Sequence, residues 1–145
     1  EGDIFSQLAR RNFISLPSLM YRRDTMTSVG GFQPYQHAAD YDLSLRMARE
    51  NPVAAIDGVY SRYRIHESNV SPHQIELGLN ECLEILSKHL PDPAAVDGMR
   101  RTRAHYACWA LRQRKILCAF QQLLKGGMST FCRMSWDRLV RDKKK

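Results

Sequence analysis

The sequence has 145 residues, 43% of them hydrophobic and 26% charged, which predicts one ordinary globular domain and disfavours a disordered chain. No apolar run approaches the roughly 20 residues of a membrane-spanning helix, and the first residues lack the basic and apolar regions of a signal peptide. We therefore expect a cytoplasmic location, with the inner face of the membrane as an alternative. Because the first residue is Glu1 and not Met, we also expect a piece of a longer protein.

Charge is divided unevenly along the sequence. The net charge is +7, yet residues 1–95 hold 9 Lys/Arg against 12 Asp/Glu, whereas residues 96–145 hold 13 against 3. Such a basic half suits an anionic surface, either phospholipid headgroups or nucleic acid. Nucleic acid is the weaker choice because no recognition fold or interleaved aromatic platform accompanies the charge. The remaining alternatives are peripheral contact with an anionic membrane and a helical extension with a solvated basic face.

Hydrophobic periodicity predicts four elements in the first fifty residues. Residues 4–11 predict a short helix, and the apolar, proline-interrupted run 13–23 predicts an extended segment at a sheet edge or a bent strand. Residues 24–29 predict a single helical turn that two glycines close. Residues 40–50 carry apolar side chains at helical spacing and predict a helix that Asn51–Pro52 ends.

After residue 52 the sequence predicts first two strands and then helices. Residues 53–56 and 59–66 predict two strands around a turn at Asp57–Gly58. A Ser-Pro start predicts a helix over 72–90, with Ser71 as its cap. A second long helix is predicted from about residue 94 or 100 to 125, and a basic amphipathic helix from 129 to 145.

Asp40 is the first candidate for chemistry. Asp is a preferred capping residue, and the local pattern alone favours a helix cap over catalysis. The two roles are compatible, because a carboxylate fixed and charged at a helix start is oriented as a general base must be. Asp42 lies about 200° around the helix from Asp40, so the two cannot form an acid/base pair. We expect Asp42 to be either a first-turn charge or a structural partner, with Arg46, four residues on, as the candidate partner.

A row of basic residues is the second candidate. Alternation in the strand 59–66 places Arg62, Arg64 and His66 on one face. Exposed edge strands carry charges simply to prevent aggregation, and this reading is favoured for an isolated strand. Beside a phosphate-bearing substrate, however, the same row could neutralise a departing diphosphate, and His66 could coordinate a divalent metal.

Four segments of the sequence stand out together: Asn12–Arg23, Val29–Phe32, Ala39–Ala48, and Tyr63–His66 with Asn69 and Ser71. In this order they resemble the C-terminal half of the catalytic domain of family 2 glycosyltransferases of the bacterial type. The resemblance covers about residues 1–72, and its order and spacing make it more specific than any single segment.

The resemblance implies the GT-A fold, an α/β nucleotide-binding architecture. Residues 1–71 would be its acceptor-side part and residues 72–145 an all-α basic extension, giving a mostly helical chain with a few short strands. It also implies inverting transfer of a sugar from a nucleotide-sugar donor to the hydroxyl of a sugar or lipid-linked acceptor. Biosynthesis of cell-envelope polysaccharide is the expected setting.

The resemblance also assigns roles to individual residues. Asp40 corresponds to the base that deprotonates the acceptor, and Gly30 and Gly31 to a loop lining the donor and acceptor sites. Arg64 and His66 correspond to contacts with the diphosphate or a metal. Ala39 departs from the pattern, because the family has Glu there, and this removes a carboxylate that could orient the acceptor.

The resemblance further implies a divalent metal, Mg²⁺ or Mn²⁺. Its main ligands, an Asp-x-Asp motif in the nucleotide-binding half of the family, are not in this sequence. We therefore expect these 145 residues alone to be inactive. The alternative function is a non-catalytic helical module that binds a partner protein or an anionic membrane surface.

Overall fold

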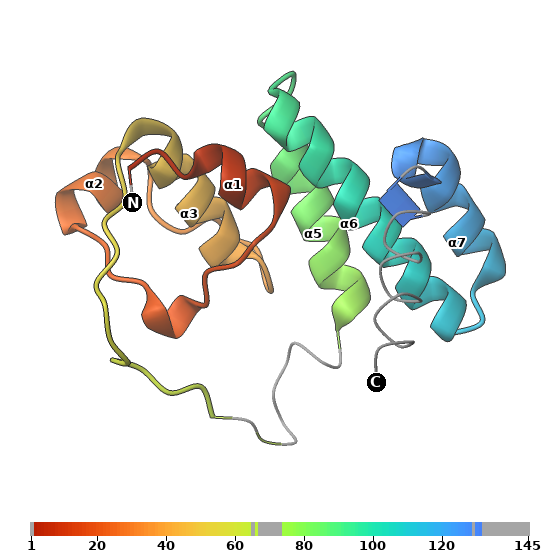
Figure 1. Ribbon diagram of the computed structural model, residues 1–145, viewed down its shortest axis with the longest axis horizontal. Coiled ribbons are helices and arrows are strands. Elements are labelled where there is room, and N and C mark those ends of the chain that lie inside the picture. Colours follow the sequence, from red (N-terminus) through yellow and green to blue (C-terminus); the bar gives the residue numbers. More distant parts are fainter. Residues whose placement is uncertain (1, 65, 67–73, 129, 132–145) are drawn as a thin grey trace.

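In the described residues, the regular structure consists almost entirely of helices (Figure 1). The computed structural model describes residues 2–64, 66, 74–128, 130 and 131. In the described part, the only β pairing is an isolated antiparallel bridge between Gly2 and Val53. In chain order the elements are α1 (Phe5–Arg10), the 3-10 turn η1 (Leu16–Ser18), α2 (Arg23–Ser28), α3 (Ala39–Glu50), α5 (Ile75–Ser87), α6 (Pro93–Arg112), α7 (Ile116–Gln122) and the π-helical turn η2 (Leu123–Gly127).

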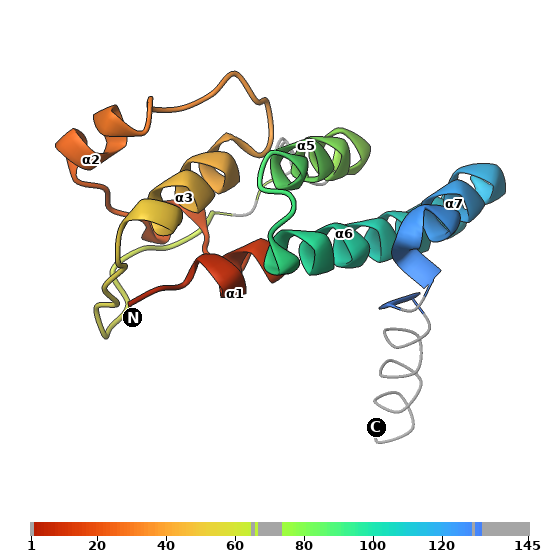
Figure 2. The same cartoon turned by 90° about the horizontal axis from the view of Figure 1, so that it is seen from above.

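Helix α6 is the spine of the molecule. Figure 2 shows it running from α1 towards α7, with α5 alongside it and α3 next to α1. Its start is fixed by Asp92, whose carboxylate accepts the Ala94 N–H at 2.8 Å, while Pro93 occupies the first helical position. The start of α1 is held in the same way, because Asp3 accepts the Phe5 N–H at 3.1 Å.

Two hydrophobic clusters lie along this spine. The larger one joins α1, α3, α5 and the start of α6, and the smaller one joins the end of α6 to α7. Burying such apolar surface is the main source of stability for helices of this length. The buried members of the larger cluster are Ile4, Phe5, Leu8, Ala9, Ala38, Tyr41, Leu45, Ala48, Ile85, Leu86, Ala94 and Ala95; those of the smaller cluster are Ala107, Ala110 and Ala119.

The two ends of the spine pack through small residues. At the α1 end, a Cβ atom on Gly98 would lie 2.0 Å from the carbonyl oxygen of Ala9, so only glycine allows this approach. At the other end, the three buried residues of the smaller cluster are all alanine. Helix α6 therefore meets both neighbours at close range.

The four helices predicted within residues 4–90 are confirmed in the described residues. They correspond to α1, α2, α3 and α5. The periodicity that predicted α3 is borne out in detail, because Tyr41, Leu45 and Ala48 are all buried. The mostly helical character of the chain is thus confirmed for the described part.

The predicted strands are wrong. Residues 13–22 form η1 and non-repetitive segments, and Arg23 already begins α2. Residues 54–64 and 66 form no regular element, and Val53 contributes only its single bridge to Gly2. An alternating segment becomes a strand only when a neighbouring backbone pairs with it. The predicted strand face with Arg62, Arg64 and His66 therefore does not form in the described residues.

The predicted helix to residue 125 is also wrong, because it is two helices. The chain reverses at Arg114, whose φ of 59° is in the left-handed region. The Arg114 N–H donates to the Leu111 carbonyl at 3.0 Å and the Lys115 N–H to the Ala110 carbonyl at 2.8 Å. These two bonds form a Schellman turn, which usually has glycine at the left-handed position. The turn folds α7 back onto α6.

Two predictions fall wholly or mostly on residues that the structure does not describe. The proposed cap Ser71 is one of them, and of the helix predicted at 129–145 only residues 130 and 131 are described. In the parts of the chain that are described, no helix combines the length and apolar character needed to span a bilayer.

Candidate functional site at the start of helix α3

The start of α3 is anchored by a carboxylate from another helix. Both oxygens of Glu81, in α5, accept backbone N–H groups of Gln36, His37 and Ala38 at 2.8–2.9 Å. Burial works to raise the pKa of Glu81, but these three bonds outweigh it and hold the pKa below its ordinary value. The chain entering α3 is therefore fixed to α5 by one buried side chain.

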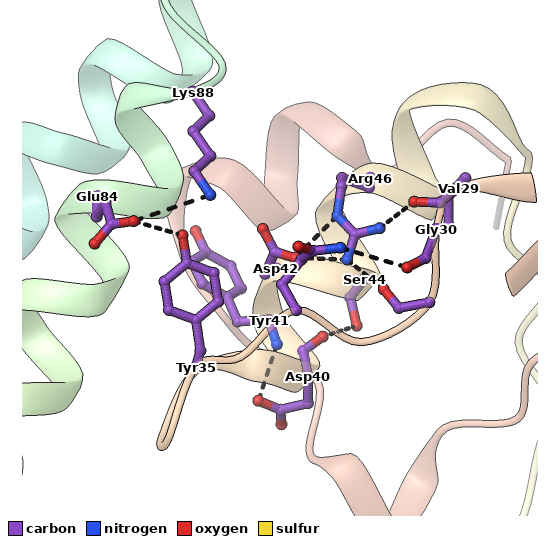
Figure 3. A network of polar contacts seen from close by, with 12 residues as sticks. Val29, Gly30, Tyr35, Asp40, Tyr41, Asp42, Ser44, Arg46, Glu84 and Lys88 are labelled. Atoms are coloured by element: carbon purple, nitrogen blue, oxygen red, sulfur yellow. Dashed lines mark hydrogen bonds and ion pairs between the residues drawn. The ribbon is translucent and has the colours of Figure 1, made fainter. Parts of the chain in front are cut away.

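Asp40 is not the helix cap that the local pattern favours. Ala38 occupies the cap position, and Asp40 is the second residue of the helix. Its Oδ1 accepts the N–H of Tyr41 at 2.9 Å. Figure 3 shows that the Asp40 carboxylate points away from the polar network around Asp42. The side chain is half-buried and held by one hydrogen bond at the beginning of the helix.

The predicted pair of Asp42 and Arg46 is confirmed. Asp42 is 1% exposed, and its Oδ2 accepts from Arg46 Nη2 at 2.6 Å and Nε at 2.9 Å. The same guanidinium donates to the carbonyl oxygens of Val29 and Gly31, the latter at 2.7 Å (Figure 3). A buried ion pair therefore holds the glycine loop against α3, on a different side of the helix from Asp40.

Gly30 and Gly31 form the loop that ends α2. Their φ angles are +84° and +63°, which favour glycine. The Gly30 N–H donates to the Thr27 carbonyl at 3.0 Å and the Gly31 N–H to the Met26 carbonyl at 2.9 Å. This is the same Schellman turn that closes α6, so Gly30 has a structural role of its own. At Gly31, a Cβ atom would meet no heavy atom within 4 Å, so the loop faces open space.

Two further side chains approach Asp40. The Ser44 hydroxyl donates to the Asp40 carbonyl oxygen at 2.6 Å and shares a 2.9 Å hydrogen bond with the Tyr21 hydroxyl. Burial, with a smaller contribution from the charge of Asp40, raises the pKa of Tyr21. Burial and then the charges of Glu81 and Asp40 raise the pKa of Cys82 to about 11, so its thiol stays protonated at neutral pH.

Arg64 and His66 lie on a different segment. Both are exposed, and Figure 1 shows the stretch leading to residue 64 running below α3, apart from the helix start that carries Asp40. The described residues contain no group of three or more His, Cys, Asp or Glu that could hold a metal ion. His66 would be a single ligand, and the expectation places the main ligands of the divalent metal outside these 145 residues.

Sequence reasoning missed Glu81, Tyr21 and Cys82 as neighbours of Asp40. The available signal for Glu81 was its place in α5, one turn before the buried Ile85, which puts an acid on an apolar face. Tyr21 belongs to a segment that carries the family resemblance, although the resemblance gives it no role. Nothing local to Cys82 indicates that it approaches Asp40.

The arrangement can accept a proton. A partly exposed carboxylate, oriented by a backbone N–H in the first turn of a helix, is suited to deprotonate a hydroxyl that approaches from solvent. The nearby Tyr21 and Cys82 side chains are half-buried, and because burial raises the pKa of each, both bear a proton at neutral pH. Comparison with known protein-family models, curated proteins and solved structures finds no match to this chain.

Proposed function

We propose that this chain is the acceptor-side half of an inverting glycosyltransferase of the GT-A type, and that Asp40 is its general base. The observation that carries the proposal is the position of Asp40 in the first turn of α3. Its carboxylate points away from the buried Asp42 pair, which holds the Gly30–Gly31 loop on a different side of the helix. A partly exposed carboxylate with a fixed orientation at a helix start can meet an acceptor hydroxyl.

In the proposed reaction Asp40 accepts the proton of an acceptor hydroxyl. The acceptor oxygen attacks the anomeric carbon of the nucleotide sugar from the face opposite the leaving group, so the new bond forms with inversion. The bond to the nucleoside diphosphate breaks, and the diphosphate leaves with the electron pair. The proposal gives Arg64 and His66 contact with that diphosphate and places the nucleotide-binding part, with the main metal ligands, outside these 145 residues.

Exposed apolar side chains on two irregular segments support the proposal that this chain is one half of a domain. Met20 is 91% exposed, Val59 90% and Tyr60 77%. Large apolar side chains exposed to this degree are a usual sign of a surface that another part of a protein covers. In the proposal, the nucleotide-binding half covers this surface.

The test is Asp40→Asn in the full-length protein. Transfer is measured as release of nucleoside diphosphate from a panel of uridine- and guanosine-diphosphate sugars with sugar and lipid-linked acceptors. Loss of the base should lower kcat by about 10²- to 10⁴-fold. Asp24→Asn, which removes an exposed carboxylate in the first turn of α2, is the matched control and should retain activity. If Asp40→Asn folds like the wild type and transfers sugar at a similar rate, the assignment fails.

The second candidate is a non-catalytic helical binding module. The exposed apolar face of α7 favours it, because a face of this kind suits contact with another surface. The two candidates differ in what precedes Glu1. From the family resemblance, an Asp-x-Asp motif at a strand end, roughly 80 to 130 residues before Asp40, would favour the enzyme. A full-length protein without that motif and without transfer activity would favour the module.

A further inference from the structure

Helix α7 carries apolar side chains both on the side that packs on α6 and on a second side that is exposed to solvent. Its inner face packs on α6 through Ala119. The residues of its outer face have spacings that place them within about 100° of the helix circumference. A surface helix is normally polar on its solvent side. The outer residues are Ile116, Leu117 and Phe120 of α7, with Leu124 of the following turn η2, and they are 69%, 80%, 56% and 62% exposed.

The surroundings of this outer face are basic. Residues 98–136 contain no Asp or Glu. Arg112, Arg114, Lys115 and Lys125 flank α7, and all four are exposed. Lys115 bonds to Glu76 at 2.6 Å. For Arg112 and Arg114, the described residues offer no carboxylate within ion-pair distance. An exposed apolar row with positive charge at both ends is therefore the dominant feature of this end of the molecule.

We propose that the outer face of α7 docks on an anionic lipid bilayer. The four apolar side chains enter the boundary between headgroups and acyl chains, and the flanking Arg and Lys side chains meet lipid phosphates. Charge complementarity selects this occupant. A second copy of the chain, packed through the same face, would bring its own cations against these cations. The docking does not depend on the role of Asp40.

The position of α7 suits such docking. Figures 1 and 2 both show α7 at the opposite end of the molecule from α2 and α3. A bilayer under α7 would therefore leave the glycine loop and the start of α3 accessible. The surface would hold the protein close to a lipid-linked acceptor without covering the candidate site.

The test is co-sedimentation of the full-length protein with vesicles. Vesicles of phosphatidylcholine with phosphatidylglycerol are compared with pure phosphatidylcholine, at low and at physiological salt. We expect binding to the anionic vesicles that weakens as salt rises. Leu117→Gln with Phe120→Gln should weaken it by at least about tenfold, because two apolar side chains no longer enter the bilayer. Arg112→Gln with Arg114→Gln should weaken it by about tenfold.

The matched control removes two exposed apolar side chains outside α7. Ile75→Gln with Leu90→Gln should bind like the wild type, and circular dichroism should show that every variant keeps its helix content. The proposal is overturned by no binding to anionic vesicles, by equal binding to neutral ones, or by full binding of the Leu117/Phe120 variant. A different outcome also overturns it: the wild type does not bind vesicles but forms a dimer, and the Leu117/Phe120 variant abolishes that dimer. In that case a second copy of the chain covers the face.

Discussion

Gly98 in α6 lies directly against the carbonyl oxygen of Ala9 in α1, where any Cβ atom would come within 2.0 Å of that oxygen. The obstacle is backbone, which cannot rotate away as a side chain could. The contact therefore fixes how closely the first helix sits on the spine of the molecule, and with it one wall of the larger hydrophobic cluster.

Gly98→Ala should destabilise the fold although alanine is the better helix former. Separating α1 from α6 costs about 1–3 kcal/mol or more in lost packing, which exceeds the gain of about 1 kcal/mol from helix propensity. Urea denaturation measures the difference. Gly78→Ala in α5 is the control, because its Cβ would lie at an ordinary 3.6 Å from His37 Cβ and the change should stabilise by about 0.5–1 kcal/mol. A stabilised Gly98→Ala variant would contradict the close approach.

Glu81→Gln should destabilise the protein by about 1–3 kcal/mol at neutral pH. The amide supplies one acceptor oxygen where the carboxylate supplies two, and its NH₂ group then faces backbone N–H groups. The measurement is the denaturation midpoint of Glu81→Gln relative to the wild type. Glu84→Gln, which alters an exposed carboxylate of the same helix, is the control. Equal effects of the two changes would show that Glu81 does not anchor the start of α3.

The anchoring role of Glu81 also predicts that its contribution to stability depends on pH. The pKa of Glu81 in the folded state lies below its ordinary value of 4.5. Its contribution to stability is therefore fully present above about 4.5 and is lost as the pH falls through the folded-state pKa. The difference in stability between wild type and Glu81→Gln should be largest near neutral pH and should shrink as the pH is lowered below 4.5. A constant difference down to the acid transition would contradict the anchoring role.

Asp42→Asn should loosen the glycine loop as well as destabilise the fold. Removing the charge leaves Arg46, whose side chain is 22% exposed, without its ion-pair partner, at a cost of about 3 kcal/mol. Hydrogen exchange should become faster at the amides of Gly30 and Gly31. Asp97→Asn breaks the more exposed pair with Arg101 and should cost less than about 1 kcal/mol without changing those amides. Unchanged exchange in Asp42→Asn would mean that Arg46 does not hold the loop.

The helices could be predicted from sequence where local periodicity coincides with tertiary packing. In α3 the apolar stripe that predicts a helix is also the stripe that is buried, and the spacing of Asp42 and Arg46 predicts their pairing. The expected strands depended on partners that the local pattern does not contain. The described residues of the alternating run 59–66 meet no neighbouring strand, and Val59, Tyr60 and Tyr63 are exposed.

The candidate site was only partly predictable for the same reason. Asp40 and the two glycines stand out in the sequence because glycine and a helix-start carboxylate are local signals. Glu81 is more than forty residues away from the backbone groups that it binds, and no spacing rule connects them. The break at Arg114 was missed because the turn there lacks its usual glycine.

Helices α2 and α6 end in the same turn, with Gly30 at the left-handed position in one and Arg114 in the other. The second turn forms with a full side chain, at a cost of about 1 kcal/mol. Helix termination alone therefore does not require glycine at position 30. Replacing Gly30 with Asn or Arg, which the turn accommodates, therefore separates its role in ending the helix from a role in binding. If Gly30 only ends α2, the variant loses about 1 kcal/mol of stability and nothing else. If a substrate approaches the loop closely, the variant also binds that substrate more weakly.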